Sequence, residues 1–320
     1  MNFVIIVIMK NSLAKIVGLA TTLFLPFYSK AAVFNSFSVG NSLTGQSLQH
    51  IGDDISDLAN AKGVNLNWAM HLKCGSSLEN IIANPTTTCV GPSVAYGYYG
   101  NALPNYKWDA VTLEPYGDPF NSARSSVSTL IGLTKSNPAN NSTKIYLLQI
   151  WPQNPSPDNF ATRWTRSYDP YIDDPESRWS RQYSLDLLSK VRTDNPNSLV
   201  GMVPTTEVLF KLDELAKAGK FTAFSSADQL YGDPNHLNPI GSYIARMTLM
   251  STMLNVSPVG LPLQSQTINL LNPADTLLIQ KTVWDVVSSD SSLTLIPEPS
   301  CLALFTIFTF VGLTKRNRKI

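Results

Sequence analysis

The sequence predicts an α/β fold, a three-layer α/β/α sandwich with a central five-stranded parallel sheet. Two observations predict it: short, continuous apolar runs of strand length recur along the chain, and amphipathic helical stretches separate them. The length of 320 residues is enough for one large domain with a substantial core. The five expected strands are residues 32–40, 64–70, 108–114, 144–151 and 198–204.

The expected helices follow from apolar residues at helical spacing. In residues 47–63 these are Leu48, Ile51, Ile55 and Leu58, and Gly63 ends the stretch. The remaining expected helices are residues 121–135, 176–192, 207–218 and 239–254. Residues 33–256 would therefore form the main domain.

The segment 257–296 differs from this pattern. Its short apolar runs, "TINLL", "TLLI" and "TVWDVV", are separated by Asn, Pro and Ser. We expect a small β-rich appendage or a spacer here.

The N-terminal residues 1–32 are typical of a signal peptide. Lys10 and Lys15 precede an apolar run at 16–27, and Ala31 and Ala32 supply small residues for cleavage. Since the first eight residues are largely apolar, translation could also start at Met9. A membrane anchor is the alternative interpretation, although the run is shorter than the ~20 residues a span needs.

The C-terminal residues 297–320 combine Pro297-Glu298-Pro299, an apolar segment at 301–313 and a basic tail. That order would hold a chain in a bilayer with the tail on the cytoplasmic side. It resembles the PEP-CTERM sorting signal of Gram-negative bacteria. The resemblance implies export, transient anchoring in the inner membrane, an exosortase-type processing protease as partner, and delivery to the cell surface or extracellular matrix. A plain C-terminal anchor is the alternative.

The charge bears on the expected partners, and the cysteine content on a possible disulfide. With 24 basic and 23 acidic residues the formal net charge is +1, so no nucleic-acid partner is expected. Cys301 lies in the C-terminal segment, which leaves Cys74 and Cys89 as the pair in the exported part. An oxidising compartment permits a disulfide, worth ~3 kcal/mol for a loop of this length, but two free thiols are also possible.

The stretch "FSVGNSLT" places Ser42 directly after the first strand, at the sheet edge where α/β proteins bind ligands. A serine nucleophile needs an imidazole base that a carboxylate orients. The chain has three histidines. Of these, His236 lies in "GDPNHLNP", and Asp233, three residues earlier, can fold back on its ring.

The blocks "GNSLT" (40–44) and "DPNHL" (233–237) resemble the first and last conserved blocks of the SGNH, or GDSL-type, hydrolases, a family of flavodoxin-like α/β/α esterases. The likeness in strand order and block placement runs from residue 33 to about 254. It implies that Ser42 is the nucleophile, His236 the general base and Asp233 the residue that orients it.

The same resemblance implies an oxyanion hole. Gly75 in "CGSSLEN" matches the family's second block, so the backbone amides of Ser42 and Gly75 would face the developing oxyanion. The third block departs from the pattern, because this chain has "TLEPYGDP" without the usual asparagine. An ionised Glu114 cannot donate to an oxyanion, so Tyr116 or the backbone of Gly117 is the candidate third donor.

Four other residues have weaker claims. His71 could line the pocket, although a hydrogen-bonded structural histidine is the more common case. His50 is expected to be exposed or structural. Asp228 is a second candidate carboxylate, but eight residues separate it from His236. Asn41 fits both a nucleophile turn and an ordinary helix cap.

Residues 151–179 form a long insertion after the fourth strand, which should lie over the active site. Trp151, Trp164 and Tyr168 could form an aromatic shelf that binds sugar rings, or they could pack into a small core of the insertion itself. The sorting signal favours an exported saccharide, so acyl esters, most simply acetyl, on polysaccharides are the expected substrates. Lipid esters remain an alternative.

The sequence therefore predicts an exported carboxylic ester hydrolase that works through an acyl-enzyme. An O-acyltransferase would use the same residues, and a non-catalytic polysaccharide-binding or matrix protein could retain the fold. No cofactor is expected. Because the histidines are scattered, no metal site is expected either.

Overall fold

The computed structural model describes residues 33–154, 160–169 and 174–296. The predicted signal peptide and sorting segment lie outside these residues. Within the described ranges, no helix has both the length and the apolar character that crossing a membrane requires.

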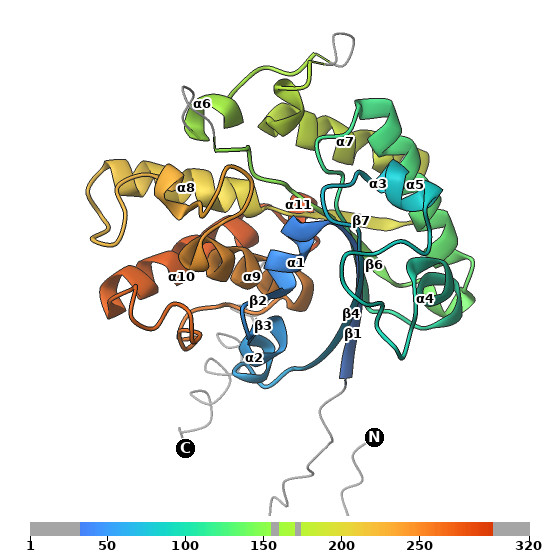
Figure 1. Cartoon of the computed structure of the whole chain (residues 1–320), viewed down its shortest axis with the longest axis horizontal. Helices are drawn as coiled ribbons and strands as arrows, with labels where there is room; N and C mark the ends of the chain where they lie inside the picture. Colours follow the sequence, from blue (N-terminus) through green and yellow to red (C-terminus); the bar gives the residue numbers. More distant parts are fainter. Residues whose placement is uncertain (1–32, 155–159, 170–173, 297–320) are drawn as a thin grey trace, which may run out of the picture. The chain divides into compact units, whose positions relative to one another are not determined.

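A five-stranded parallel sheet forms the middle of the fold (Figure 1). Its strand order is β4-β1-β5-β6-β7. The strands are β1 (Val33–Gly40), β4 (Asn65–Leu72), β5 (Ala110–Leu113), β6 (Lys144–Leu148) and β7 (Leu199–Val203). Strand β1 pairs in parallel with both β4 and β5, with Gly40 opposite Leu72 and Val39 opposite Leu113. The carboxyl ends of these three strands therefore lie side by side, and the predicted fold class is confirmed.

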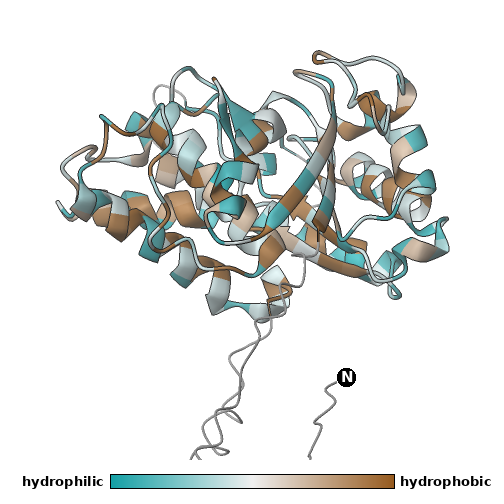
Figure 2. Ribbon diagram, turned by 90° about the horizontal axis from the view of Figure 1, so that it is seen from below, coloured by the Kyte–Doolittle hydropathy of each residue, from teal (hydrophilic) through white to brown (hydrophobic). Residues whose placement is uncertain are grey.

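Helices cover both faces of the sheet (Figure 1). One layer contains α1 (Ser42–Leu48), α2 (Ile55–Asn60), α8 (Thr205–Lys217), α9 (Pro239–Leu254) and α10 (Pro273–Ser289). The other contains α3 (Leu78–Ala83), α4 (Tyr99–Asn105), α5 (Phe120–Lys135) and α7 (Arg181–Asp194). These helices carry both apolar and polar residues, as helices that cover a sheet do (Figure 2).

Alternate residues of the strands face the two layers. In β6, Ile145 and Leu147 belong to the core on the α5 and α7 side, whereas Tyr146 and Leu148 belong to the core on the α9 side. Because both faces are buried, strands such as β6 and β7 are apolar at nearly every position, which is the pattern that made them recognisable.

The helix predicted over residues 47–63 is wrong as a single element. Helix α1 ends at Leu48, a two-stranded hairpin of β2 (Gln49–His50) and β3 (Asp53–Asp54) follows, and α2 begins at Ile55. Ile51 and Gly52 turn this hairpin with φ of 44° and 86°. Ile51 is 68% exposed, so its helical spacing with Leu48 and Ile55 is fortuitous.

The β-rich appendage predicted for residues 257–296 is also wrong. Helix α10 occupies most of this segment, with Asn272 as its N-cap and Pro273 at its first position. Ile279, Val283 and Val287 are buried at a spacing of four and join the core on the α9 side. The short apolar runs are thus one helical stripe that polar residues interrupt.

The remaining elements are short. Helices α3 and α4 lie between β4 and β5, where no helix was predicted. The others are α6 (Phe160–Trp164), α11 (Ser291–Thr294) and the 3-10 helices η1 (Pro138–Asn140), η2 (Ser177–Trp179) and η3 (Ala227–Leu230).

Candidate active site

Ser42 is the first residue of α1, immediately beyond the carboxyl end of β1. Asn41 is the N-cap, and its Oδ1 accepts from the amide of Leu43 at 2.9 Å. Its Nδ2 donates to the carbonyl of Ser76 at 3.3 Å, so the turn is also tied to the loop after β4. Ser42 is half-buried on a turn fixed from two sides.

The loop that carries His236 connects η3 to α9. Tyr231 and Leu237 form a β-bridge across its base. Inside the loop, Oδ1 of Asp233 accepts from the amides of Asn235 and His236, each at 2.8 Å. A short carboxylate that bonds its own backbone in this way makes a tight turn, and the turn brings the Asp233 carboxylate against the histidine ring.

The two segments meet although 194 residues separate them. The Oγ of Ser42 lies 2.9 Å from Nε2 of His236. On the opposite side of the ring, Nδ1 lies 2.8 Å from Oδ2 and 3.1 Å from Oδ1 of Asp233. A hydroxyl, an imidazole and a carboxylate are thus connected in the order that nucleophilic catalysis needs.

The acid–base half of this arrangement is open to solvent. The side chain of His236 is 36% exposed and that of Asp233 is 51% exposed. Partial burial acts to raise the pKa of Asp233, but hydrogen bonds from the Asn235 and His236 amides and from the ring outweigh it and lower this pKa. Asp233 is therefore ionised at neutral pH and favours the Nδ1–H tautomer of the ring.

Two side chains hold the exposed loop in place. Gln46, on α1, donates through Nε2 to the carbonyl of Leu237 at 2.8 Å and accepts from its amide at 3.1 Å. Trp151 donates through Nε1 to the carbonyl of Asn235 at 2.9 Å. The residues on both sides of His236 are therefore anchored to α1 and to the segment after β6.

The first turn of α1 leaves one amide for a ligand. The amides of Asn41 and Thr44 donate to Glu114, that of Leu43 to Asn41, and that of Gly45 to the Asn41 carbonyl. Among the described residues, the Ser42 amide has no such partner. An amide in this position can donate to an anionic oxygen.

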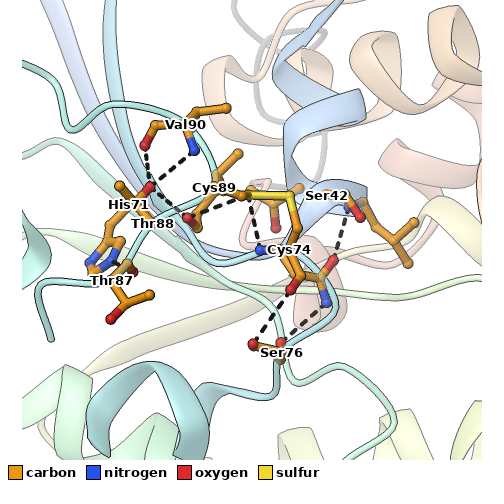
Figure 3. Close-up of a disulfide and its surroundings, with 12 residues drawn as sticks. Ser42, His71, Cys74, Ser76, Thr87, Thr88, Cys89 and Val90 are labelled. Carbon is orange, nitrogen blue, oxygen red and sulfur yellow. Dashed lines mark hydrogen bonds between the residues drawn. A yellow bond between two sulfur atoms is a disulfide. The ribbon is translucent and has the colours of Figure 1, made fainter. Parts of the chain in front are cut away.

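The loop after β4 also contains a backbone amide that has no acceptor among the described residues. Cys74 and Cys89 form a disulfide, and the Cys74 amide donates to the sulfur of Cys89 at 2.9 Å (Figure 3). The Ser76 amide donates to the carbonyl of Lys73. Gly75, with φ of 64°, lies between them, and its amide has no acceptor among the described parts of the chain. The disulfide thus closes the loop directly beside this free donor.

Glu114 lies in the third block, where the third oxyanion donor was expected. Its Oε2 accepts from the amides of Asn41 at 2.9 Å and Thr44 at 3.0 Å and from the Thr44 hydroxyl. Burial raises the pKa of Glu114 to about 7. Tyr116 uses its amide to donate to the Glu114 carbonyl. Its ring packs edge-on against Trp179 at 5.1 Å, so the hydroxyl is the one group of Tyr116 that could serve as a third donor. The amide of Gly117, the other candidate, has no acceptor among the described residues and stays a candidate.

The prediction of an aromatic shelf is wrong. Trp151, Trp164 and Tyr168 are all buried. Tyr168 packs against Phe120 and Tyr183, and the two tryptophans belong to the core on the α9 side. Burial of a large apolar ring is more favourable than its exposure, and here it fastens the insertion to the domain instead of offering a surface to sugars.

The weaker candidates have structural partners. His71 is buried, its Nε2 lies 2.9 Å from the Thr87 carbonyl, and burial lowers its pKa. Burial, followed by the charge of Arg246, lowers the pKa of half-buried His50. Asp228 accepts from the Phe160 amide at 3.0 Å. None of these three side chains has a hydrogen bond to Ser42 or His236 within the described segments.

Sequence reasoning missed the contacts that Gln46, Trp151 and Glu114 make with the site. Gln46 lies four residues after Ser42 on the same helix, a spacing that could have pointed to the same side of α1. Nothing in the sequence indicated that Trp151 would contact the loop of His236. In the described part of the chain, no cluster of His, Cys, Asp and Glu side chains has the arrangement of a metal site.

Comparison with known proteins supports the fold alone. No family model matches the chain, and no curated protein matches it. Among solved structures, a DUF4886 family protein from Bacteroides uniformis ATCC 8492 matches with a TM-score of 0.55 and 14% identity, covering 80% of this chain and 95% of that one. A protein described as "a putative SGNH hydrolase", from Slackia heliotrinireducens, matches with a TM-score of 0.42 and 21% identity, covering 69% and 100%. The first of these likenesses supports the α/β architecture.

Proposed function

We propose that this protein is an exported serine esterase that removes acyl groups, most simply acetyl, from hydroxyls of polysaccharides. The observation that carries the proposal is the 2.9 Å contact between Ser42 Oγ and His236 Nε2, with Asp233 on the other ring nitrogen.

The first half of the reaction transfers the acyl group to the enzyme. Ser42 Oγ attacks the ester carbonyl carbon while its proton moves to His236 Nε2, and Asp233 stabilises the imidazolium. The amides of Ser42 and Gly75 donate to the oxyanion, and each such donor is typically worth ~3 kcal/mol in the transition state. When the intermediate collapses, the C–O bond to the alcohol breaks and His236 returns the proton to the leaving oxygen.

The second half releases the acid. A water molecule gives a proton to His236 Nε2 and attacks the acyl-enzyme carbonyl. When this intermediate collapses, the bond between the carbonyl carbon and Ser42 Oγ breaks, and His236 returns the proton to Oγ. The exposed His236 ring gives water direct access. If a sugar hydroxyl replaced the water, the same residues would catalyse acyl transfer.

The choice of a polymeric substrate rests on the openness of the site and on the sequence of the termini. His236 and Asp233 stand at the surface, so an acetyl group on a bulky carrier can approach without entering a deep channel. The signal-like and PEP-CTERM-like segments favour export to the cell surface or matrix, with an exosortase-type protease as the processing partner. The disulfide between Cys74 and Cys89 supports an oxidising compartment.

The test measures acetate release by the full chain, purified in detergent, from a panel of acetylated polysaccharides. We expect release by the wild type and loss of about 10³-fold or more in Ser42→Ala, because the nucleophile is removed. Asn121→Ala, on the exposed start of α5, is the matched control and should keep wild-type activity. Binding of a polysaccharide without acetate release, or full activity of Ser42→Ala, would favour the non-catalytic binding protein.

A further inference from the structure

Glu114 is a completely buried carboxyl that the proposed reaction does not use. It follows the last residue of β5 and lies beside the end of β1, the neighbouring strand. A buried carboxyl is costly unless hydrogen bonds compensate for its lost hydration. Its bonds therefore indicate what the side chain is placed to do.

Among the described residues, all the hydrogen bonds that the Glu114 carboxyl accepts come from the turn that carries Ser42. Oε2 accepts from the amide of Asn41, just before Ser42, and from both the amide and the hydroxyl of Thr44, two residues after it. Ser42 is thus held between two residues that share one acceptor atom. Of the amides at residues 41–45, only that of Ser42 has no acceptor among the described residues.

The glycine before this turn fits the same carboxyl. A Cβ on Gly40 would lie 2.2 Å from the Thr44 hydroxyl oxygen, 2.5 Å from Oε2 of Glu114 and 2.8 Å from its Cβ. No heavy atom can be accommodated at such distances. Gly40, Thr44 and Glu114 therefore form one interlocked group around the nucleophile turn.

We propose that Glu114 is a positioning residue for the nucleophile: its carboxyl fixes the turn at residues 41–44 so that Ser42 Oγ stays within reach of His236 and the Ser42 amide stays free for the oxyanion. This inference rests on the proposed esterase function. Glu114 acts through the backbone of its neighbours and does not touch the substrate.

The chemistry of the contact selects the test variants. Oε2 acts as an acceptor whether the group is ionised or neutral, and Oε1 is buried without a hydrogen-bond partner among the described residues. Glutamine can present its carbonyl oxygen to the two amides and the hydroxyl. Methionine keeps the bulk of the side chain but accepts such bonds only weakly. Glu114→Gln should therefore keep the activity that Glu114→Met loses.

Asp275 provides a matched control. It is also a buried carboxyl that accepts backbone amides, those of Thr222 at 3.1 Å and Ala223 at 3.0 Å, but it lies in the first turn of α10, which has no part in the proposed site. Asp275→Met should lower the melting temperature, as Glu114→Met does, without changing turnover by the folded protein.

The experiment measures kcat and KM for a small acetyl ester, the melting temperature, and the rate at which a fluorophosphonate labels Ser42, all on the full chain. For Glu114→Met we expect kcat and the labelling rate to fall by about 10- to 100-fold with KM nearly unchanged, because a misplaced nucleophile loses attack geometry. Glu114→Gln should stay within about 3-fold of wild type, and Asp275→Met within about 2-fold.

The outcomes separate this inference from the proposed function. If the wild type turns over the ester, Ser42→Ala does not, and a folded Glu114→Met still does, the role of Glu114 is overturned but the proposed function is not. Equal losses in Glu114→Met and Glu114→Gln, or equal losses in Asp275→Met, also overturn it. A wild type that neither turns over the ester nor reacts with the fluorophosphonate overturns both. If Glu114→Met does not fold, Thr44→Val removes one of the three bonds and should lower kcat about 5-fold, whereas an unchanged kcat would contradict the inference.

Discussion

The two halves of the candidate triad are held by different means. The nucleophile turn at residues 40–44 is mostly buried and is fixed from within by the Glu114 carboxyl. The loop of Asp233 and His236 is exposed, and side chains anchor its backbone from outside. The turn that carries the nucleophile is therefore fixed within the interior, whereas the acid–base pair lies on a surface loop that depends on a few contacts. Substitutions in the two regions should differ in how they divide between stability and turnover.

The largest expected effect is on the exposed side. His236→Ala should lower kcat by about 10³-fold, because it removes the base, and should leave the melting temperature close to wild type. Asp233→Asn should lower kcat by about 10²-fold or more through loss of the correct tautomer. Asp228→Asn, the other candidate carboxylate, is the comparison. If Asp228→Asn were the more damaging to the pH-independent kcat, the assignment of Asp233 would be wrong.

In the buried region, the predicted effect is a dependence of the free energy of unfolding on pH. Burial raises the pKa of Glu114 from 4.5 to about 7, so between these values the folded protein binds more protons than the unfolded chain. The free energy of unfolding should therefore fall as the pH rises from about 4.5 to 7, by at most on the order of 3 kcal/mol from this group. Chemical denaturation of wild type and Glu114→Gln across this range measures it, and equal slopes in the two proteins would contradict it.

Asp118 must be considered in the same experiment. Burial also raises the pKa of Asp118 to about 7, and its charge contributes to the shift of Glu114. The slope that remains in Glu114→Gln should decrease further in Glu114→Gln/Asp118→Asn.

Gln46 links the two regions, so its loss should affect both quantities. Gln46→Ala removes the pair of bonds to Leu237 and should cost about 1–3 kcal/mol of stability and about 10-fold in kcat. Gln264→Ala is the control, because Gln264 is a buried amide that bonds Arg246 and the Asp54 carbonyl instead. A loss of kcat in Gln264→Ala as large as that in Gln46→Ala would show that the effect is not specific to the loop.

The smallest effect concerns Trp151. Trp151→Phe keeps an apolar ring but removes the bond to the Asn235 carbonyl, at a cost of about 1 kcal/mol and a few-fold in kcat. Trp108→Phe removes a similar buried bond, to the Ala102 carbonyl, far from the triad in sequence. Thermal melts and steady-state kinetics of both variants should show similar losses of stability, with a loss of kcat in Trp151→Phe alone.

The strands and long helices could be predicted because the spacing of apolar residues within each segment shows which positions are buried. Helix α9 begins and ends where its pattern predicted, at Pro239 and Leu254. Residues 47–63 were misjudged because Ile51 has helical spacing but an exposed position in a turn, which only the backbone reveals. In α10 the stripe was divided by polar residues, so its short pieces resembled strands.

The site was predictable where one loop contains its own partners, as with Asp233 and His236. Ser42 could be placed beside them only through the resemblance of its motif and the expected order of the sheet. The role of Glu114 depends on β5 lying next to β1, a contact between residues more than 70 positions apart. Likewise, the sequence could not distinguish an exposed aromatic shelf from rings buried in the core, since both use the same residues.

The most direct test of the account is to locate the covalent adduct that a fluorophosphonate forms with the full chain. Digestion and peptide mass spectrometry identify the modified residue. We expect a single adduct on Ser42 that forms far more slowly in His236→Ala, because that base activates the hydroxyl. An adduct on another residue, or a Ser42 adduct that forms equally fast without His236, would contradict it.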